Sequence, residues 1–101
     1  MRTRNKSYSD YGITEEEKKY IFDFCRSADD KQKAIIKEAL SELNPYISRY
    51  IYRSLVYNQS YDDICKEEYI FMRKEDFYGY RRKGMEAIKR YMLLYGIWKG
   101  K

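Results

Sequence analysis

Hydrophobic residues recur every three or four positions along most of the chain, which is the spacing of one face of an amphipathic helix. The first such stripe comprises Ile21, Phe24, Cys25 and Ala28. Thr14 and Glu17 stand just before it with the spacing of a capping box, in which two side chains bond the first backbone amides of a helix. We therefore expect the first helix to begin at residue 15.

The same spacing predicts two further helices, one on either side of Pro45, the only proline. The second helix is expected over about 30–43, and its inward residues are Ala34, Ile36, Ala39, Leu40 and Leu43. Asn44 suits an N-cap and Pro45 suits the first position of a helix, so one helix should end and the next begin there. The third helix is expected over about 45–57, and its inward residues are Ile47, Tyr50, Ile51, Ser54 and Leu55.

A short helix followed by a long one is predicted in the last third of the chain. Ser60 and Asp63 have capping-box spacing and open a fourth helix over about 61–68, with Ile64 and Cys65 pointing inward. After a turn through 69–72, the helical period resumes at about residue 73 and continues to about residue 94. The inward residues of this longest helix are Phe77, Tyr80, Gly84, Ala87, Ile88, Tyr91 and either Leu94 or Tyr95.

Together these elements predict an all-α fold, a small single-domain bundle of about five helices over residues 14–101. Residues 1–13 are polar and basic without a period, and we expect them to form a flexible arm. The tail after residue 95 is expected to fray, unless Ile97 and Trp98 fold back over the core.

The distribution of charge along the chain predicts the class of partner that the protein binds. The chain carries a formal net charge of +5, and residues 66–101 hold 10 basic and 5 acidic residues, whereas residues 14–44 hold 6 basic and 8 acidic ones. Clustered Lys and Arg neutralise phosphates and release their counterions. The basic C-terminal third therefore predicts an anionic partner such as nucleic acid.

Few residues suit catalysis or a metal. The chain has no histidine, and Cys25 and Cys65 are 40 positions apart, so we expect buried free thiols rather than a zinc site or a catalytic pair. The adjacent carboxylates at 62–63 and 67–68 point about 100° apart on a helix and do not converge on one substrate atom. No apolar run approaches the ~18 residues of a membrane span. The sequence thus predicts a cytoplasmic protein that is no enzyme and needs no metal or cofactor.

The segment from Ser60 to Arg90, a short helix joined by a tight apolar turn to a long basic helix, outlines a helix-turn-helix at about 60–92. In that motif the second helix enters the major groove of DNA. The outward face of the long helix is expected to carry Lys74, Glu75, Tyr78, Arg81, Arg82, Met85 and Lys89. Base edges would be met by Lys74, Tyr78 and Arg81. Phosphates would be met by Arg82, Lys83, Lys89 and Arg90.

Residues 60–92, SYDDICKEEYIFMRKEDFYGYRRKGMEAIKRYM, resemble the helix-turn-helix of sigma factor region 4 and of phage-encoded late transcription regulators of the ArpU and RinA type. SYDDIC is similar to the first helix of the motif, and DFYGYRRKGMEAIKRYM is similar to its recognition helix. The resemblance covers about a third of the chain. Two features depart from the pattern: Cys65 and Phe77 are two residues further apart than the standard turn allows, and Tyr69 stands near the usual glycine.

This resemblance implies a DNA-binding transcriptional regulator of phage or prophage origin, with double-stranded DNA as its partner, RNA polymerase as a second contact, and a homodimer if the operator is palindromic. Two alternatives stay open. A DNA-packaging protein of the small terminase type would form rings. An inhibitor or other interaction protein would use the tyrosine-rich surface to bind RNA polymerase or another host protein, and would not bind DNA.

Overall fold

Five α-helices and one short 3-10 helix make up residues 7–99, the part of the chain that the computed structural model describes. In chain order they are η2 (Ser9–Tyr11), α1 (Glu15–Arg26), α2 (Asp30–Leu40), α3 (Pro45–Val56), α4 (Tyr61–Cys65) and α5 (Lys74–Leu94). Residues 7–99 contain no β-strand. The prediction of a small all-α protein with five helices is confirmed.

Local capping explains why the helices begin where they do. Complete capping boxes stand before α1 (Thr14 with Glu17), α2 (Asp29 with Gln32) and α4 (Ser60 with Asp63). The positions where the helices end agree less well with the prediction than the positions where they begin. α2 ends at Leu40 and α4 ends at Cys65, each three residues before its predicted end, because the chain passes into a turn after each of these helices.

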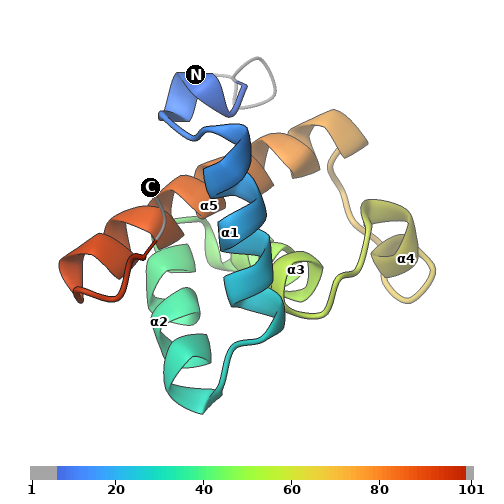
Figure 1. The fold of residues 1–101 in the computed structure, drawn as a ribbon. Helices are drawn as coiled ribbons and strands as arrows, with labels where there is room; N and C mark the ends of the chain where they lie inside the picture. The colour runs from blue at the N-terminus through green and yellow to red at the C-terminus, as the bar shows by residue number, and fades with distance from the viewer. Residues whose placement is uncertain (1–6, 100–101) are drawn as a thin grey trace.

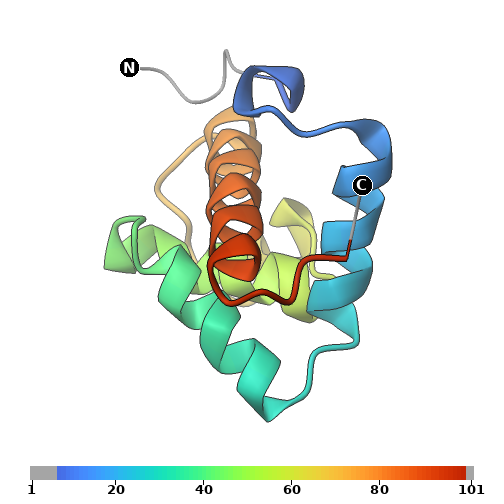
Figure 2. The same cartoon turned by 60° about the vertical axis from the view of Figure 1, so that its left-hand side comes forward.

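Helix α5 is the element against which the rest of the molecule packs. It spans the width of the protein, with α4 at the end where α5 begins and α2 below the end where it finishes (Figure 1). Viewed nearly along its axis, α5 has α1 to one side and α2 and α3 beneath it (Figure 2). Gly84 lies at the crossing with α2 and α3, where an added Cβ would stand 2.7 Å from Leu40 Cδ2 and 3.3 Å from Ile51 Cγ2. A glycine here lets the three helices approach closely.

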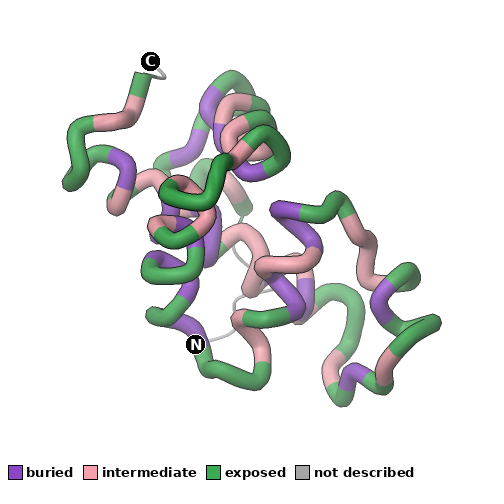
Figure 3. The backbone as a smooth tube through the Cα atoms, turned by 90° about the horizontal axis from the view of Figure 1, so that it is seen from below, coloured by how far each residue is buried: buried purple, intermediate pink, exposed green. Residues whose placement is uncertain are grey.

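The buried residues lie where the helices meet (Figure 3), but predicted inward positions in α2 and at the end of α5 are wrong. Ala34 is exposed, because the buried side of α2 runs through Ile36, Ala39 and Leu40. Leu94 and Tyr95 are exposed as well. The last turn of α5 buries Met92 instead and extends beyond the end of α2.

Both described ends of the chain fold onto the helices. In the predicted flexible arm, residues 7–13 form η2 and a turn, and Ile13 is buried in the core; residues 1–6 of that arm lie outside the described part. At the other end the chain returns to α1 (Figure 2), where Trp98 packs edge-on against Tyr20 at 4.9 Å between centroids. The alternative in which Ile97 and Trp98 fold back is therefore the one observed.

Candidate nucleic-acid interface

Aromatic residues dock α4 against the first turns of α5. Phe77 is fully buried, and its ring meets that of Tyr61 edge-on at 5.3 Å between centroids. The Tyr61 N–H donates to the Tyr78 hydroxyl oxygen at 3.2 Å, and the Tyr61 hydroxyl donates to the Met72 carbonyl at 2.5 Å. Burial raises the pKa of Tyr61, which keeps its hydroxyl protonated for this bond. Thus α4, the connection and the start of α5 form one packed unit.

The connection between these helices, residues 66–73, is longer than the tight turn that the sequence predicts. Two arginines on α3 hold it: Arg49 bonds Glu68 at 2.9 Å, and Arg53 bonds both Glu67 and Glu68. This longer connection accommodates the two residues by which the separation of Cys65 and Phe77 exceeds that of the standard helix-turn-helix. It also leaves Cys65 exposed, so its predicted inward position is wrong.

The connection exposes two rings and retains positive charge. Tyr69 is 82% exposed and Phe71 is 67% exposed. Since the acids at 67 and 68 are paired with α3, the charges of the connection that no α3 arginine meets are those of exposed Lys66 and Arg73, and the first turn of α5 adds Glu75 and Asp76 beside them. We call residues 66–74 the connection surface, because Lys74 continues it on the first turn of α5.

The three residues predicted to meet base edges are not on one exposed face. Lys74 is exposed and forms a 3.2 Å ion pair with Asp62 at the surface. Tyr78 is half-buried in the contact with α4. Arg81 is half-buried between α1, α3 and α5, and Met85 on the same side of the helix is completely buried. The predicted outward face is therefore wrong at Met85, and Arg81 lies at the contact with α1 rather than on the same exposed face as Lys74.

Two predicted phosphate contacts, Lys89 and Arg90, are engaged by carboxylates within the protein. Lys89 Nζ lies 2.8 Å from Glu17 Oε2 and donates to the Gly12 carbonyl at 3.2 Å. This bond lowers the pKa of Glu17, with help from the backbone of Thr14. Arg90 bonds Glu42 at 2.6 Å and also Glu86, and its hydrogen bonds lower the pKa of Glu42. These cations stabilise helix contacts.

The other two predicted phosphate contacts lie toward the outer side of α5. Lys83 is exposed on the middle of the helix. Arg82 is half-buried, with its guanidinium carbon 5.9 Å from the centroid of the Tyr8 ring in the segment that leads into η2. The outer side of α5 thus presents Lys83 to solvent, next to an arginine that supports the N-terminal segment.

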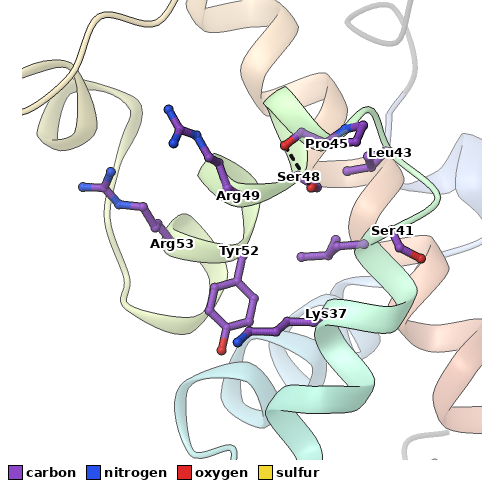
Figure 4. Close-up of a pocket in the computed structure, with 9 residues that line it drawn as sticks. Lys37, Ser41, Leu43, Pro45, Ser48, Arg49, Tyr52 and Arg53 are labelled. Atoms are coloured by element: carbon purple, nitrogen blue, oxygen red, sulfur yellow. Dashed lines mark hydrogen bonds between the residues drawn. The ribbon is translucent and has the colours of Figure 1, made fainter.

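A groove between α2 and α3 is a feature that the helical pattern did not predict. Its volume is about 480 Å³. Its lining residues are Lys37, Leu40, Ser41, Leu43, Pro45, Ser48, Arg49, Tyr52 and Arg53 (Figure 4). Leucine and proline side chains form its apolar wall, whereas Lys37, Arg49 and Arg53 carry positive charge at its rim. The feature of the sequence that could have indicated this groove is the spacing of Arg49 and Arg53, which lie one helical turn apart on the outward side of α3.

Other site classes find no support in the described part of the chain. Residues 7–99 contain no group of three or more His, Cys, Asp or Glu side chains that could hold a metal ion. None of the described helices combines the length and apolar character that crossing a bilayer requires. Comparison with family models, with curated proteins and with solved structures gave no match to this chain.

Proposed function

We propose that this protein is a DNA-binding transcriptional regulator, of the phage or prophage type that its helix-turn-helix resemblance implies, and that its connection surface meets the DNA. The observation that carries the proposal is the pairing of Glu67 and Glu68 with arginines of α3. It fixes the connection in place and neutralises its acids. Lys66, Arg73 and Lys74 are then the exposed cations along this edge, and Glu75 and Asp76 follow them in the first turn of α5.

Three features of this edge suit a nucleic-acid backbone. Its cations are exposed, and the surface pair between Lys74 and Asp62 is weak enough, at about 0–1 kcal/mol, to be exchanged for a phosphate. The exposed rings of Tyr69 and Phe71 offer apolar contacts to sugars or bases. Lys83 extends positive charge along the outer side of α5. The first turns of α5, rather than its middle, are the part proposed to enter the major groove.

Binding of a fluorescent duplex across a salt series tests this function. The variant Arg73→Gln/Lys74→Gln removes two proposed phosphate contacts, whereas Lys19→Gln/Lys31→Gln removes two exposed charges from α1 and α2. We expect the wild type and the control pair to bind with the same salt dependence. The test variant should bind more weakly, and its salt slope should fall by about one for each lost contact. An absence of wild-type binding at low salt, or equal losses in both variants, would contradict the proposal.

The groove between α2 and α3 favours a second function, contact with a protein. Its apolar wall and the exposed Lys37 at its rim suit an amphipathic segment that carries an acidic residue, whereas Arg49 and Arg53 are paired with the connection. RNA polymerase is the first partner to test. Ser48 lines the groove and is only half-buried, so Ser48→Trp should fill the groove while leaving the fold intact. Loss of binding to purified polymerase in this variant would support the second function, and binding that is absent in the wild type or unchanged in the variant would contradict it.

A further inference from the structure

Arg81 is a half-buried cation whose charge faces aromatic rings rather than a carboxylate. Its guanidinium carbon lies 5.0 Å from the centroid of the Phe22 ring and 4.6 Å from that of Tyr78. Nη1 donates to Ser54 Oγ at 3.3 Å, and Nε is buried without any hydrogen-bond partner. Within residues 7–99 no carboxylate pairs with this side chain, whereas Lys89 and Arg53, which are similarly buried, each meet at least one.

A second guanidinium lies on the same ring. The Arg26 guanidinium carbon is also 5.0 Å from the Phe22 centroid, so the two guanidiniums lie within about twice that distance of each other. Arg26 is exposed at the end of α1 and has no carboxylate partner in the described part of the chain. Two positive charges therefore share one aromatic side chain, and no carboxylate among residues 7–99 is paired with either of them.

Such an arrangement is unfavourable without an anion. A half-buried charge that lacks a counter-charge keeps part of its desolvation penalty, and attraction to a ring face offsets only part of that penalty. The guanidinium nitrogens of exposed Arg26 and Nη2 of Arg81 can donate hydrogen bonds in the plane of each guanidinium, whereas Nη1 of Arg81 is bonded to Ser54 and its Nε is buried. Arginine donors in this geometry match the oxygens of a phosphate group.

We propose that Arg26 and Arg81, held by Phe22 and Tyr78 at the contact of α1 with α5, form a phosphate-binding site. The ligand is a phosphate group, carried either by a nucleic-acid backbone or by a small phosphorylated molecule. Arg26 supplies the accessible donors, and Arg81 supplies charge from the interior, with its position fixed by the two rings and Ser54. This site is separate from the connection surface and does not depend on the proposed function.

Thermal unfolding in inorganic phosphate, compared with chloride at equal ionic strength, tests the site directly. A ligand that binds only the folded state raises the unfolding midpoint with its concentration. We expect this rise in the wild type and in the control Lys31→Gln, a reduction by at least half in Arg26→Gln, and complete loss in Arg81→Met. Each variant is compared with itself in chloride, so a change in its basal stability does not affect the result. Equal rises in all four proteins would reflect the general effect of phosphate on protein surfaces and would overturn the proposal.

Duplex DNA binding by the same proteins identifies the source of the phosphate. If the salt slope of Arg26→Gln is lower than that of the wild type by about one, the site takes a backbone phosphate. If DNA binding is unchanged while the effect of inorganic phosphate is lost, the site takes a small phosphorylated ligand. If the wild type does not bind DNA, the proposed function is rejected but the phosphate site is not. If inorganic phosphate does not raise the unfolding midpoint of the wild type, the phosphate site is rejected but the proposed function is not.

Discussion

The positive side chains of this protein fall into groups that differ in what they contact: carboxylates, aromatic rings or solvent. Lys89, Arg90 and Arg53 bond carboxylates on other segments of the chain and tie the fold together. Arg81 instead faces aromatic rings, and exposed residues such as Arg73 face solvent. This division explains why the basic run at 81–83 is not a uniform DNA-reading surface, although its residues are adjacent in the sequence.

The ion pair between Glu17 and Lys89 gives a pH-dependent prediction. Glu17→Gln retains an oxygen that can accept from the Thr14 amide but removes the charge that faces Lys89. We expect the free energy of unfolding at neutral pH to fall by about 1–3 kcal/mol, because a largely buried ammonium group loses its counter-charge. Exposed Glu16, changed to Gln, is the matched control and should cost much less.

The sign of the pH dependence follows from the lowered pKa of Glu17. The carboxylate stabilises the folded state above its ordinary pKa of about 4.5, and this contribution is lost as the pH falls through the lower pKa of the folded state. The difference between wild type and Glu17→Gln in urea unfolding should therefore shrink toward acid pH. A difference that stays constant with pH would show that the charge is not the cause.

The two cysteines should differ in reactivity. Cys25 is buried, and burial raises its pKa to about 12, whereas Cys65 is exposed beside the connection. Since the thiolate is the reactive form and must also be reached by the reagent, Cys65 should be alkylated in the folded protein and Cys25 only after unfolding. Mass spectrometry of native and urea-treated protein measures this. Rapid alkylation of Cys25 in the folded Cys65→Ser variant would contradict the burial of α1 against the core.

At the scale of the helices, the starts and most of the buried faces were predictable, whereas part of the outward face of α5 was not. Capping residues such as Thr14 and Ser60 act within one turn, so sequence spacing alone located the starts of α1 and α4. The inward residues Phe77, Ala87 and Ile88 of α5 were predicted correctly, but Met85 was placed on the outward face, because apolar residues occur on several sides of this helix. The long arginine side chain at 81 can also enter an aromatic contact through its apolar stem. The length of the connection was hidden as well, since it depends on arginines more than a dozen residues away.

The crossing of α5 with α2 and α3 makes Gly84 sensitive to added volume. Alanine gains about 1 kcal/mol of helix propensity, but its Cβ would meet fully buried Leu40 at 2.7 Å, and overpacking costs about 1–3 kcal/mol. We expect Gly84→Ala to lower the free energy of unfolding by about 1 kcal/mol, and Gly84→Val to lower it by more. Lys83→Ala, one position away and exposed, should be nearly neutral. Stabilisation by Gly84→Ala in denaturant titrations would mean that the helices can separate at little cost.

For the whole molecule, the sequence correctly predicted an all-α protein, because hydrophobic periodicity and capping agree along the chain. The distribution of positive charge over the surface was harder to predict from the sequence. The net charge of +5 indicated an anionic partner, but ion pairs between distant residues decide which cations remain at the surface. They leave positive charge on the connection surface and at the contact of α1 with α5, two places that the charge pattern alone did not separate.

The central claim is that the connection surface, together with the first turns of α5, meets DNA. Titration of the ¹⁵N-labelled protein with a duplex, followed by amide NMR shifts, tests it most directly. The account predicts that the largest shifts fall within residues 66–74 and on the outer side of α5 near Lys83, with little change at Lys19 and Lys31 on α1 and α2. Shifts confined to the groove between α2 and α3, or no shifts at low salt, would contradict it.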